Sequence, residues 1–260
     1  MVKKNMTNDI QIIEHKKMDL SNCMLAVSFP TVGLVSSIAA HHIVDSLKLK
    51  EIGAIVSNKF MPTTIIHNKY PSPPVRIYAG KKKCGPKDGC DQIAVIMSEF
   101  MPPYEIIGSL VDTILGWAEQ KNCRVITSFE GSHGKNKTDE KENTVFGVAS
   151  NEYMQSVLKK FNIPQMGEGM ITGVTGVLLY KTALQNQNMM CLLSKAHSKF
   201  PDSRAAAELI QVLEVMLPGI KLDPKPLYDE AGRIEEKIKS FMQESKPTAP
   251  QSGFSMDMYR

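Results

Sequence analysis

The sequence contains no C-x-x-C pair, and its five cysteines are an odd number, so their spacing supports neither a zinc knuckle nor a secreted disulfide framework. A reducing, cytoplasmic compartment is therefore expected. Cys84 and Cys90 flank the turn "CGPKDGC", where a loop disulfide and two incidental thiols both remain open. No signal-peptide cleavage pattern follows the charged start "MVKKNMTND", which also argues against secretion.

The sequence also has no large excess of either positive or negative charge. The net charge is only +4 at pH 7 and is spread along 260 residues. The one basic run, Lys81-Lys82-Lys83, is expected in a solvated turn. Nucleic-acid binding is not expected, because it requires clustered Lys and Arg.

Long apolar runs are rare as well. Residues 23–44 contain no Asp, Glu, Lys or Arg, which is long enough to raise the question of a membrane span. Pro30, Gly33 and the pair His41-His42 interrupt the run, so it favours a buried strand, a turn and a core-facing helix. No membrane partner is expected.

What the chain does contain is an alternation of apolar runs with segments of helical periodicity, which predicts a three-layer α/β/α sandwich. A turn rich in Lys, Gly and Pro joins two of the runs as a hairpin, so the mostly parallel sheet is expected to be mixed. The expected strands are 23–29, 52–57, 74–79, 92–98, 123–129, 145–150 and 189–197, and the expected helices are 34–47, 102–122, 151–162, 170–186 and 202–217.

Capping residues predict where two of these helices begin. Asn151 precedes one, and Asp202 or Ser203 precedes the last, which Pro218-Gly219 would stop.

A further helix with a two-repeat heptad seam is expected near the C-terminus. Its seam could pack back on the chain's own core or against a second copy, and both alternatives stay open. The expected units are an α/β domain at 1–226, an amphipathic helix at 227–245 and a flexible tail at 246–260. The seam consists of Leu227, Ala231, Ile234, Ile238 and Phe241.

The stretch "FEGSHG" is the most tempting catalytic candidate, because Glu130, Ser132 and His133 gather at a strand end. A nucleophile elbow needs glycines two positions before and after the serine, and Glu130 occupies the earlier one. Adjacent Ser and His side chains also point apart too readily to act as nucleophile and base. We therefore predict no catalytic residues here.

Cofactor and metal motifs are equally incomplete. "GEGMITG", with Gly167, Gly169 and Gly173, has neither dinucleotide-binding spacing nor a P-loop ending, so close helix packing explains it equally well. The remaining histidines lack partners at metal-ligand spacing. No cofactor and no metal are predicted.

The last eight residues, "GFSMDMYR", place apolar side chains after the polar stretch "SKPTAPQS". Chain ends are normally polar, because only a docked segment compensates the entropy of ordering it. Met258 and Tyr259 therefore predict a binding tip on a tether. About fifteen residues beyond Ser245 would reach on the order of 20 Å as a partly stiffened coil.

Several stretches together resemble the proteasome assembly chaperone 2 family in its archaeal form. The resemblance spans roughly residues 18–222 and implies a phosphorylase/hydrolase-like fold without conventional catalytic residues. The stretches are "VGLVSSIAAHHIVDSL", "SEFMPPYEIIGSLVDTILGWA", "ITSFEG", "VFGVASN", "MITGVTGVLL" and "PDSRAAAELIQVL".

The resemblance also implies homo-oligomerisation and binding to the α-subunits of the proteasome core particle, with a paralogous chaperone as a further candidate partner. Proteins of this kind end in a hydrophobic-Tyr-any (HbYX) motif, which Met258, Tyr259 and Arg260 match. Met258 would fill an apolar pocket between α-ring subunits, and the terminal carboxylate would meet a lysine there.

The resemblance implies one of two functions, an assembly chaperone or an ATP-independent activator. Both use the same tail, so the sequence does not distinguish between them. The alternative is a phosphorylase-like or ATP-grasp-like enzyme acting on a small molecule, for which the chain shows no motif.

Overall fold

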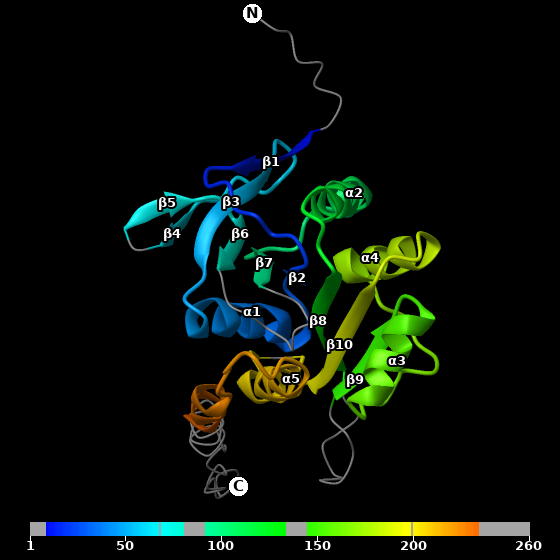
Figure 1. Cartoon of the computed structure of the whole chain (residues 1–260). Helices are drawn as coiled ribbons and strands as arrows, with labels where there is room; N and C mark the ends of the chain where they lie inside the picture. The colour runs from blue at the N-terminus through cyan, green and yellow to red at the C-terminus, as the bar shows by residue number, and fades with distance from the viewer. Residues whose placement is uncertain (1–8, 68, 81–91, 134–144, 199, 234–260) are drawn as a thin grey trace, which may run out of the picture.

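An eight-stranded sheet organises the chain, in the order β1-β3-β6-β7-β2-β8-β10-β9 (Figure 1). The computed structural model describes residues 9–67, 69–80, 92–133, 145–198 and 200–233. The strands of this sheet are β1 (Ile10–Glu14), β2 (Met24–Ser28), β3 (Lys50–Ser57), β6 (Val75–Gly80), β7 (Ile93–Ser98), β8 (Val125–His133), β9 (Val145–Ala149) and β10 (Met189–Ala196).

The centre of the sheet is parallel and its flanks are antiparallel. β7, β2, β8 and β10 run side by side in one direction, and every residue of β2 and β7 is buried. β6 and β7 form the predicted antiparallel hairpin, and β9 closes the other edge antiparallel to β10. The continuous apolar runs form the central strands because both faces of a central parallel strand are covered.

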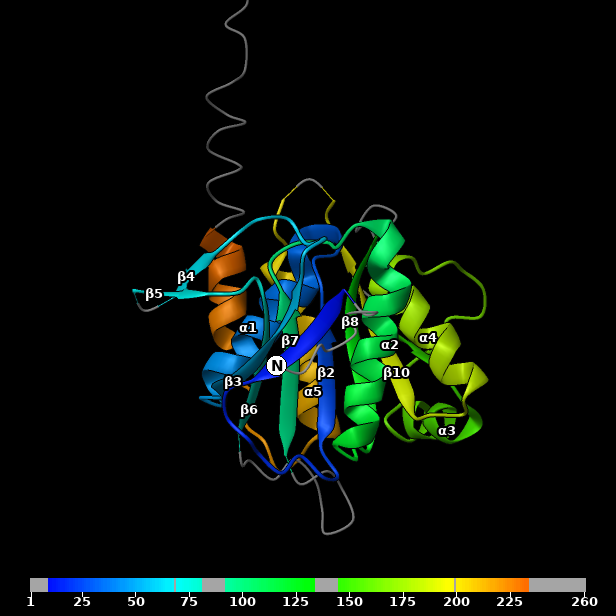
Figure 2. The ribbon, with the colours of Figure 1, turned by 90° about the horizontal axis from the view of Figure 1, so that it is seen from above.

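Helices cover both faces of the sheet, which confirms the predicted three layers. α1 and α5 lie below the sheet in Figure 1, and α2 and α4 lie above it. Figure 2 shows α2 and α4 together on the upper face. The helices are α1 (Val35–Ser46), α2 (Tyr104–Gln120), α3 (Glu152–Lys160), α4 (Gly173–Leu184) and α5 (Ser203–Met216).

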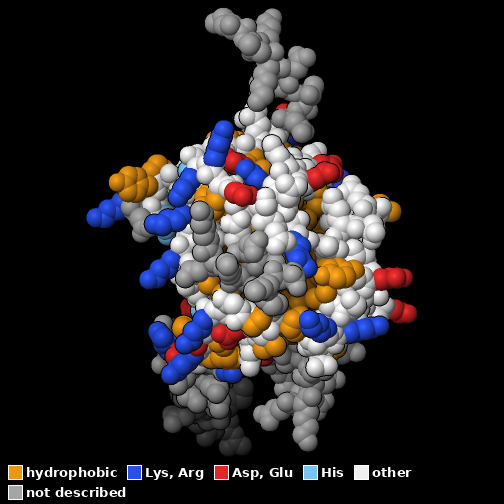
Figure 3. Space-filling model, viewed as in Figure 1, with side chains coloured by type: hydrophobic (Ala, Val, Ile, Leu, Met, Phe, Trp, Pro, Cys, Tyr) orange, Lys and Arg blue, Asp and Glu red, His pale blue; other side chains and the backbone are white. Residues whose placement is uncertain are grey.

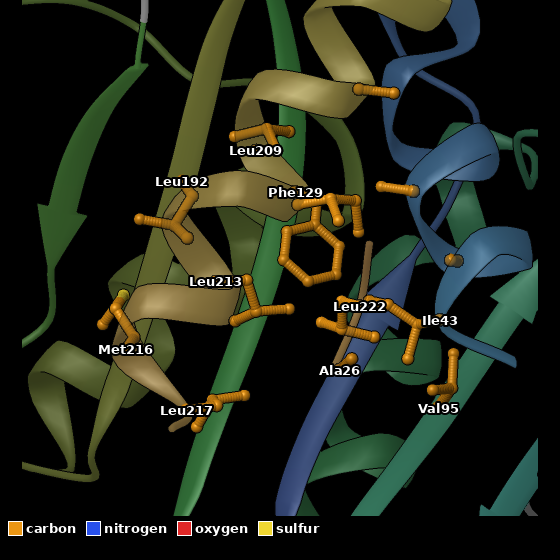
Figure 4. Packing of buried hydrophobic residues seen from close by; sticks show 14 of the residues in the cluster. Ala26, Ile43, Val95, Phe129, Leu192, Leu209, Leu213, Met216, Leu217 and Leu222 are labelled. Carbon is orange, nitrogen blue, oxygen red and sulfur yellow. The ribbon is translucent and has the colours of Figure 1, made fainter. Parts of the chain in front are cut away.

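Two hydrophobic clusters, one on each side of the sheet, form the core. The cluster between the sheet and helices α1 and α5 is called the lower cluster. In the lower cluster, the Phe129 ring of β8 points between Leu209 and Leu213 of α5 and Ile43 of α1 (Figure 4). Phe129 is 1% exposed. The lower helices are therefore held to the sheet by apolar packing around this ring.

Two helix starts follow the predicted capping chemistry. The Asn151 side chain accepts a hydrogen bond from the Met154 backbone N–H at 2.9 Å. The Asp202 side chain accepts one from the Ala205 N–H at 3.0 Å. Each carboxyl or amide oxygen satisfies a backbone donor that the first helical turn leaves unpaired.

Two outer features were not predicted. β1 pairs antiparallel with β3, and its Glu14 accepts a hydrogen bond from the Trp117 indole at 2.6 Å. A separate hairpin of β4 (Ile65–His67) and β5 (Tyr70–Ser72) projects from the body, as both views show. These strands are short or half exposed, so their sequences carry little of the apolar patterning that identifies buried strands.

The described chain ends in a helical segment, 225–233, which lies beyond α5 in Figure 1. Leu227 belongs to the lower cluster and Ala231 is buried as well, so this first part of the expected seam packs on the chain's own core. Ile234, Ile238 and Phe241 lie outside the described residues.

Candidate functional site

The residues predicted to bind the proteasome, Met258, Tyr259 and Arg260, lie outside the described residues. So do Lys81-Lys82-Lys83 and the cysteine pair Cys84 and Cys90. The structure therefore describes the candidate sites that lie in the α/β body of the chain. They are found near the ends of the parallel strands.

The "FEGSHG" stretch forms the last part of β8, and its geometry is not that of a nucleophile and its base. Ser132 and His133 are successive strand residues, so their side chains point to opposite faces of the sheet. The Ser132 hydroxyl donates to the Ser194 carbonyl at 3.4 Å, and His133 is exposed. The structure does not bring the two together.

Gly131 within that stretch has a packing role. A Cβ atom placed there would lie 2.0 Å from the carbonyl oxygen of Val32, in the short helix η1 (Val32–Leu34). The Gly131 N–H donates to the Thr31 hydroxyl at 3.1 Å. The absence of a side chain allows the turn after β2 to lie directly on β8.

Glu130 faces the first turn of α4, where Thr175 hydrogen-bonds to its side chain. Burial raises the pKa of Glu130 from its ordinary 4.5 to about 7, although the Thr175 bond opposes that shift. A carboxyl group therefore already stands at the position where a helix N-terminus would attract an anion.

The glycines of "GEGMITG" precede α4, and close packing does not explain all of them, because a Cβ at Gly167 would meet nothing within 4 Å and one at Gly169 would first meet the flexible Met166 side chain. Gly173 has a φ of +71°, a backbone conformation that side chains rarely adopt, and it begins the helix. Three residues on, a Cβ at Gly176 would lie 2.3 Å from the Ile171 carbonyl oxygen, so the preceding loop rests on the helix backbone. With the Glu130 carboxyl beside the same helix end, the arrangement does not favour phosphate binding.

Sequence reasoning missed a charged cluster formed by Arg76, Glu99 and His41. Arg76 lies within β6 and is 1% exposed. One of its guanidinium N–H groups donates to the Glu99 carboxylate. The His41 Nε2 atom lies 3.4 Å from the same carboxylate. An arginine inside a strand predicted to be buried was the only available signal that a partner must lie nearby.

The electrostatics of this cluster are those of a structural ion pair. The hydrogen bond and the electrostatic interaction with His41, together with the positive charge of Arg76, lower the pKa of Glu99 although burial opposes this. The Arg76 guanidinium lies 5.8 Å from the centre of the Tyr78 ring. Burial raises the pKa of Tyr78. The carboxylate is thus kept ionised and holds a buried cation.

Two other histidines make local contacts. His42 Nε2 lies 2.8 Å from the Leu222 carbonyl oxygen, and the His197 ring stacks on Phe200. Across the described ranges, no three His, Cys, Asp or Glu side chains come close enough to hold a metal ion. None of the helices in the described part of the chain is long and apolar enough to cross a bilayer.

The face of the molecule in Figure 3 shows no patch of positive charge that would indicate a nucleic-acid interface. Basic and acidic side chains both occur on the face shown in Figure 3, and neither sign covers it. This distribution agrees with the small net charge of +4.

A family model decides the relationship of the chain to known proteins. It matches residues 25–242 and is described as the PAC2 family. The chain belongs to the PAC2 family. This result confirms the resemblance found in the sequence. A relative from Methanocaldococcus jannaschii, described as an uncharacterised protein, is 29% identical over 254 residues, which cover 98% of this chain and 100% of the relative.

Solved structures show the same fold. Pyrococcus furiosus PbaA, described as an archaeal homologue of proteasome-assembly chaperone, matches with a TM-score of 0.79 and 24% identity, covering 91% of this chain and 93% of its own. Pyrococcus furiosus PbaB, described as an archaeal proteasome activator, matches with a TM-score of 0.75 and 20% identity, covering 90% and 99%.

Proposed function

We propose that this PAC2 protein is a cytoplasmic proteasome assembly chaperone or ATP-independent activator that binds the α-ring of the core particle. The proposal is carried by the match of nearly the whole chain to PbaA and PbaB, which are described as a chaperone homologue and an activator. The HbYX ending of the chain supports it independently.

In this proposal, residues 1–226 form the body, 227–245 a helix and 246–260 the tether that carries Met258, Tyr259 and Arg260 to the α-subunits. The body fixes where the helix begins. Leu227 packs in the lower cluster, Ala231 is buried, and the Leu222 N–H just before the helix donates to Glu214 at 3.1 Å. The helices that precede the tails would therefore begin at equivalent positions in an assembly.

Homo-oligomerisation completes the proposal, with a paralogous chaperone as an additional candidate partner. A three-residue contact buries too little surface for tight binding. Tails on one assembly raise each other's effective concentration, which multiplies avidity by roughly 10² to 10⁴. Light scattering of the purified chain tests this, and a strict monomer at micromolar concentration would remove the avidity argument.

A pull-down of proteasome α-subunits tests the contact itself. Tyr259→Ala should weaken binding far more than one side chain normally does, because every tail in the assembly changes together. Asp257→Ala is the matched control, since it lies next to the motif but outside it. Equal capture by both variants would show that the tyrosine is not the contact.

The enzyme alternative has no specific observation in its favour, because the described residues place Ser132 and His133 on opposite faces of β8. Turnover of a phosphorylase or ligase substrate by the wild type that disappears in Ser132→Ala would restore it.

A further inference from the structure

Cys23 and Cys123, one hundred residues apart in sequence, lie with their sulfur atoms 3.0 Å from each other. Each comes just before a central strand, β2 or β8, and these strands are parallel neighbours. The Arg124 N–H donates to the Cys23 carbonyl at 2.8 Å. The Asn22 N–H donates to the Asn122 carbonyl at 2.9 Å. Backbone hydrogen bonds therefore hold the two segments together at the thiols.

The distance between the sulfur atoms is about 1 Å longer than a covalent disulfide bond of ~2.05 Å. Because the two backbones are already side by side, bond formation requires a small side-chain movement and no rearrangement of the sheet. Both residues are free thiols in the structure.

The two thiols differ in access to solvent. Cys23 is fully buried, whereas Cys123 is partly exposed and lines a surface cavity of about 290 Å³ together with Asn122, Arg124 and Asn188. A small oxidant can therefore reach Cys123 first, and Cys23 stands behind it. Cys191, the other cysteine among the described residues, is fully buried in β10.

The two thiols also differ in acidity. The hydrogen bond donated by Cys23 lowers the pKa of Cys123, and the positive charge of Lys121 adds to this, while burial opposes it. The same hydrogen bond, together with burial, raises the pKa of Cys23. Cys123 is therefore the more acidic of the two thiols, and the thiolate is the form that reacts with oxidants.

We propose that Cys23 and Cys123 form a peroxide-reactive pair, in which Cys123 is oxidised first and Cys23 closes an intramolecular disulfide. The Cys123 thiolate attacks one oxygen of hydrogen peroxide, the O–O bond breaks, and the departing hydroxide takes up a proton to give water. Cys123 is then a sulfenic acid. The Cys23 sulfur attacks the Cys123 sulfur, the S–O bond breaks, and the hydroxide leaves as water with the thiol proton. Two thiols and one peroxide yield one disulfide and two waters.

The proposal does not depend on proteasome binding. The disulfide would close a loop that contains α1, β3, β6, β7 and α2. Cross-linking so long a segment restricts the unfolded chain, so the oxidised protein should melt roughly 5–10 °C higher than the reduced one.

Peptide mapping of the full chain tests the proposal. The protein carries Cys84→Ser and Cys90→Ser to remove the two thiols outside the described residues, is treated with hydrogen peroxide, alkylated and digested with trypsin without reduction. The expected product is peptide 18–48 linked to peptide 122–124, two hydrogens lighter than their sum. Recovery of both peptides alkylated separately, or of a link between two copies of 122–124, would overturn the proposal.

A second variant separates the two steps. In Cys23→Ser the resolving thiol is missing while a hydroxyl can still donate a hydrogen bond to Cys123, so the sulfenic acid at Cys123 should accumulate and be trapped by dimedone, whereas dimedone should label the parent protein far less. Equal trapping in the two proteins would show that Cys23 does not resolve the intermediate.

Discussion

Replacing Gly131 with alanine perturbs the contact between β8 and the turn after β2. The added Cβ would lie 2.0 Å from the Val32 carbonyl oxygen and 2.9 Å from its carbon. Both are backbone atoms, so a rotamer change cannot relieve the clash. The turn must move by roughly 1 Å, because non-bonded carbon atoms prefer separations above about 3.5 Å.

The cost has two parts. Overpacking of a well-packed site costs about 1–3 kcal/mol. Movement of the turn also strains the hydrogen bond from the Gly131 N–H to the Thr31 hydroxyl, which contributes about 1 kcal/mol. Gly131→Ala should therefore destabilise the protein by about 2–4 kcal/mol, which corresponds to a fall in Tm of roughly 5–15 °C for a chain of this size.

Gly116→Ala is the matched control. Gly116 lies on the exposed side of α2, and its Cβ would meet nothing within 4 Å. Alanine is the better helix former by about 0.5–1 kcal/mol, so this variant should be slightly more stable than the wild type. Both are compared with the wild type by calorimetry at one protein concentration, because association shifts Tm. A Gly131→Ala protein that melts at or above the wild-type temperature would refute the packing account.

Three further substitutions test the core and the buried charges. Phe129→Ala removes the ring at the centre of the lower cluster and should cost about 3–5 kcal/mol in urea unfolding. Glu99→Gln should cost about 1–3 kcal/mol at neutral pH by weakening the partner of buried Arg76, an amount reduced because Glu99 is partly exposed. Because the folded-state pKa of Glu99 is lowered, that difference should shrink as the pH falls toward it. The pKa of Glu130 is raised to about 7 in the folded state, from an ordinary value of 4.5. The folded protein therefore binds this proton more tightly than the unfolded chain, and the stability gained from it is complete below pH 4.5 and is lost as the pH rises through 7. Glu130→Gln should therefore gain up to about 2–3 kcal/mol relative to the wild type between pH 5 and pH 8, and a gain independent of pH would contradict that assignment.

Local chemistry made the elements of the body predictable. Asn151 and Asp202 mark helix starts because capping involves residues only a few positions apart. The buried strands were predictable because both of their faces are covered, which produces continuous apolar runs. The polar alternation in β1 and the short β4–β5 hairpin gave no such pattern.

Contacts between distant segments were not predictable. The meeting of Cys23 with Cys123, and of Arg76 with Glu99 and His41, depends on strand order and register, which single-sequence patterns do not specify. The broken spacing around Ser132 was informative, because the expectation of a non-enzymatic protein agrees with membership of the PAC2 family and with the descriptions of PbaA and PbaB. The predicted tail contact stays a prediction.

Deletion of Met258, Tyr259 and Arg260 tests the central claim most directly. Binding of the full chain and of the chain ending at Asp257 to purified core particle is titrated under the same conditions, and peptide hydrolysis by the particle is followed in parallel. The account predicts that the deletion abolishes binding and any effect on hydrolysis, while the oligomeric state and Tm of the chain stay unchanged. Unchanged binding and hydrolysis after the deletion would contradict it.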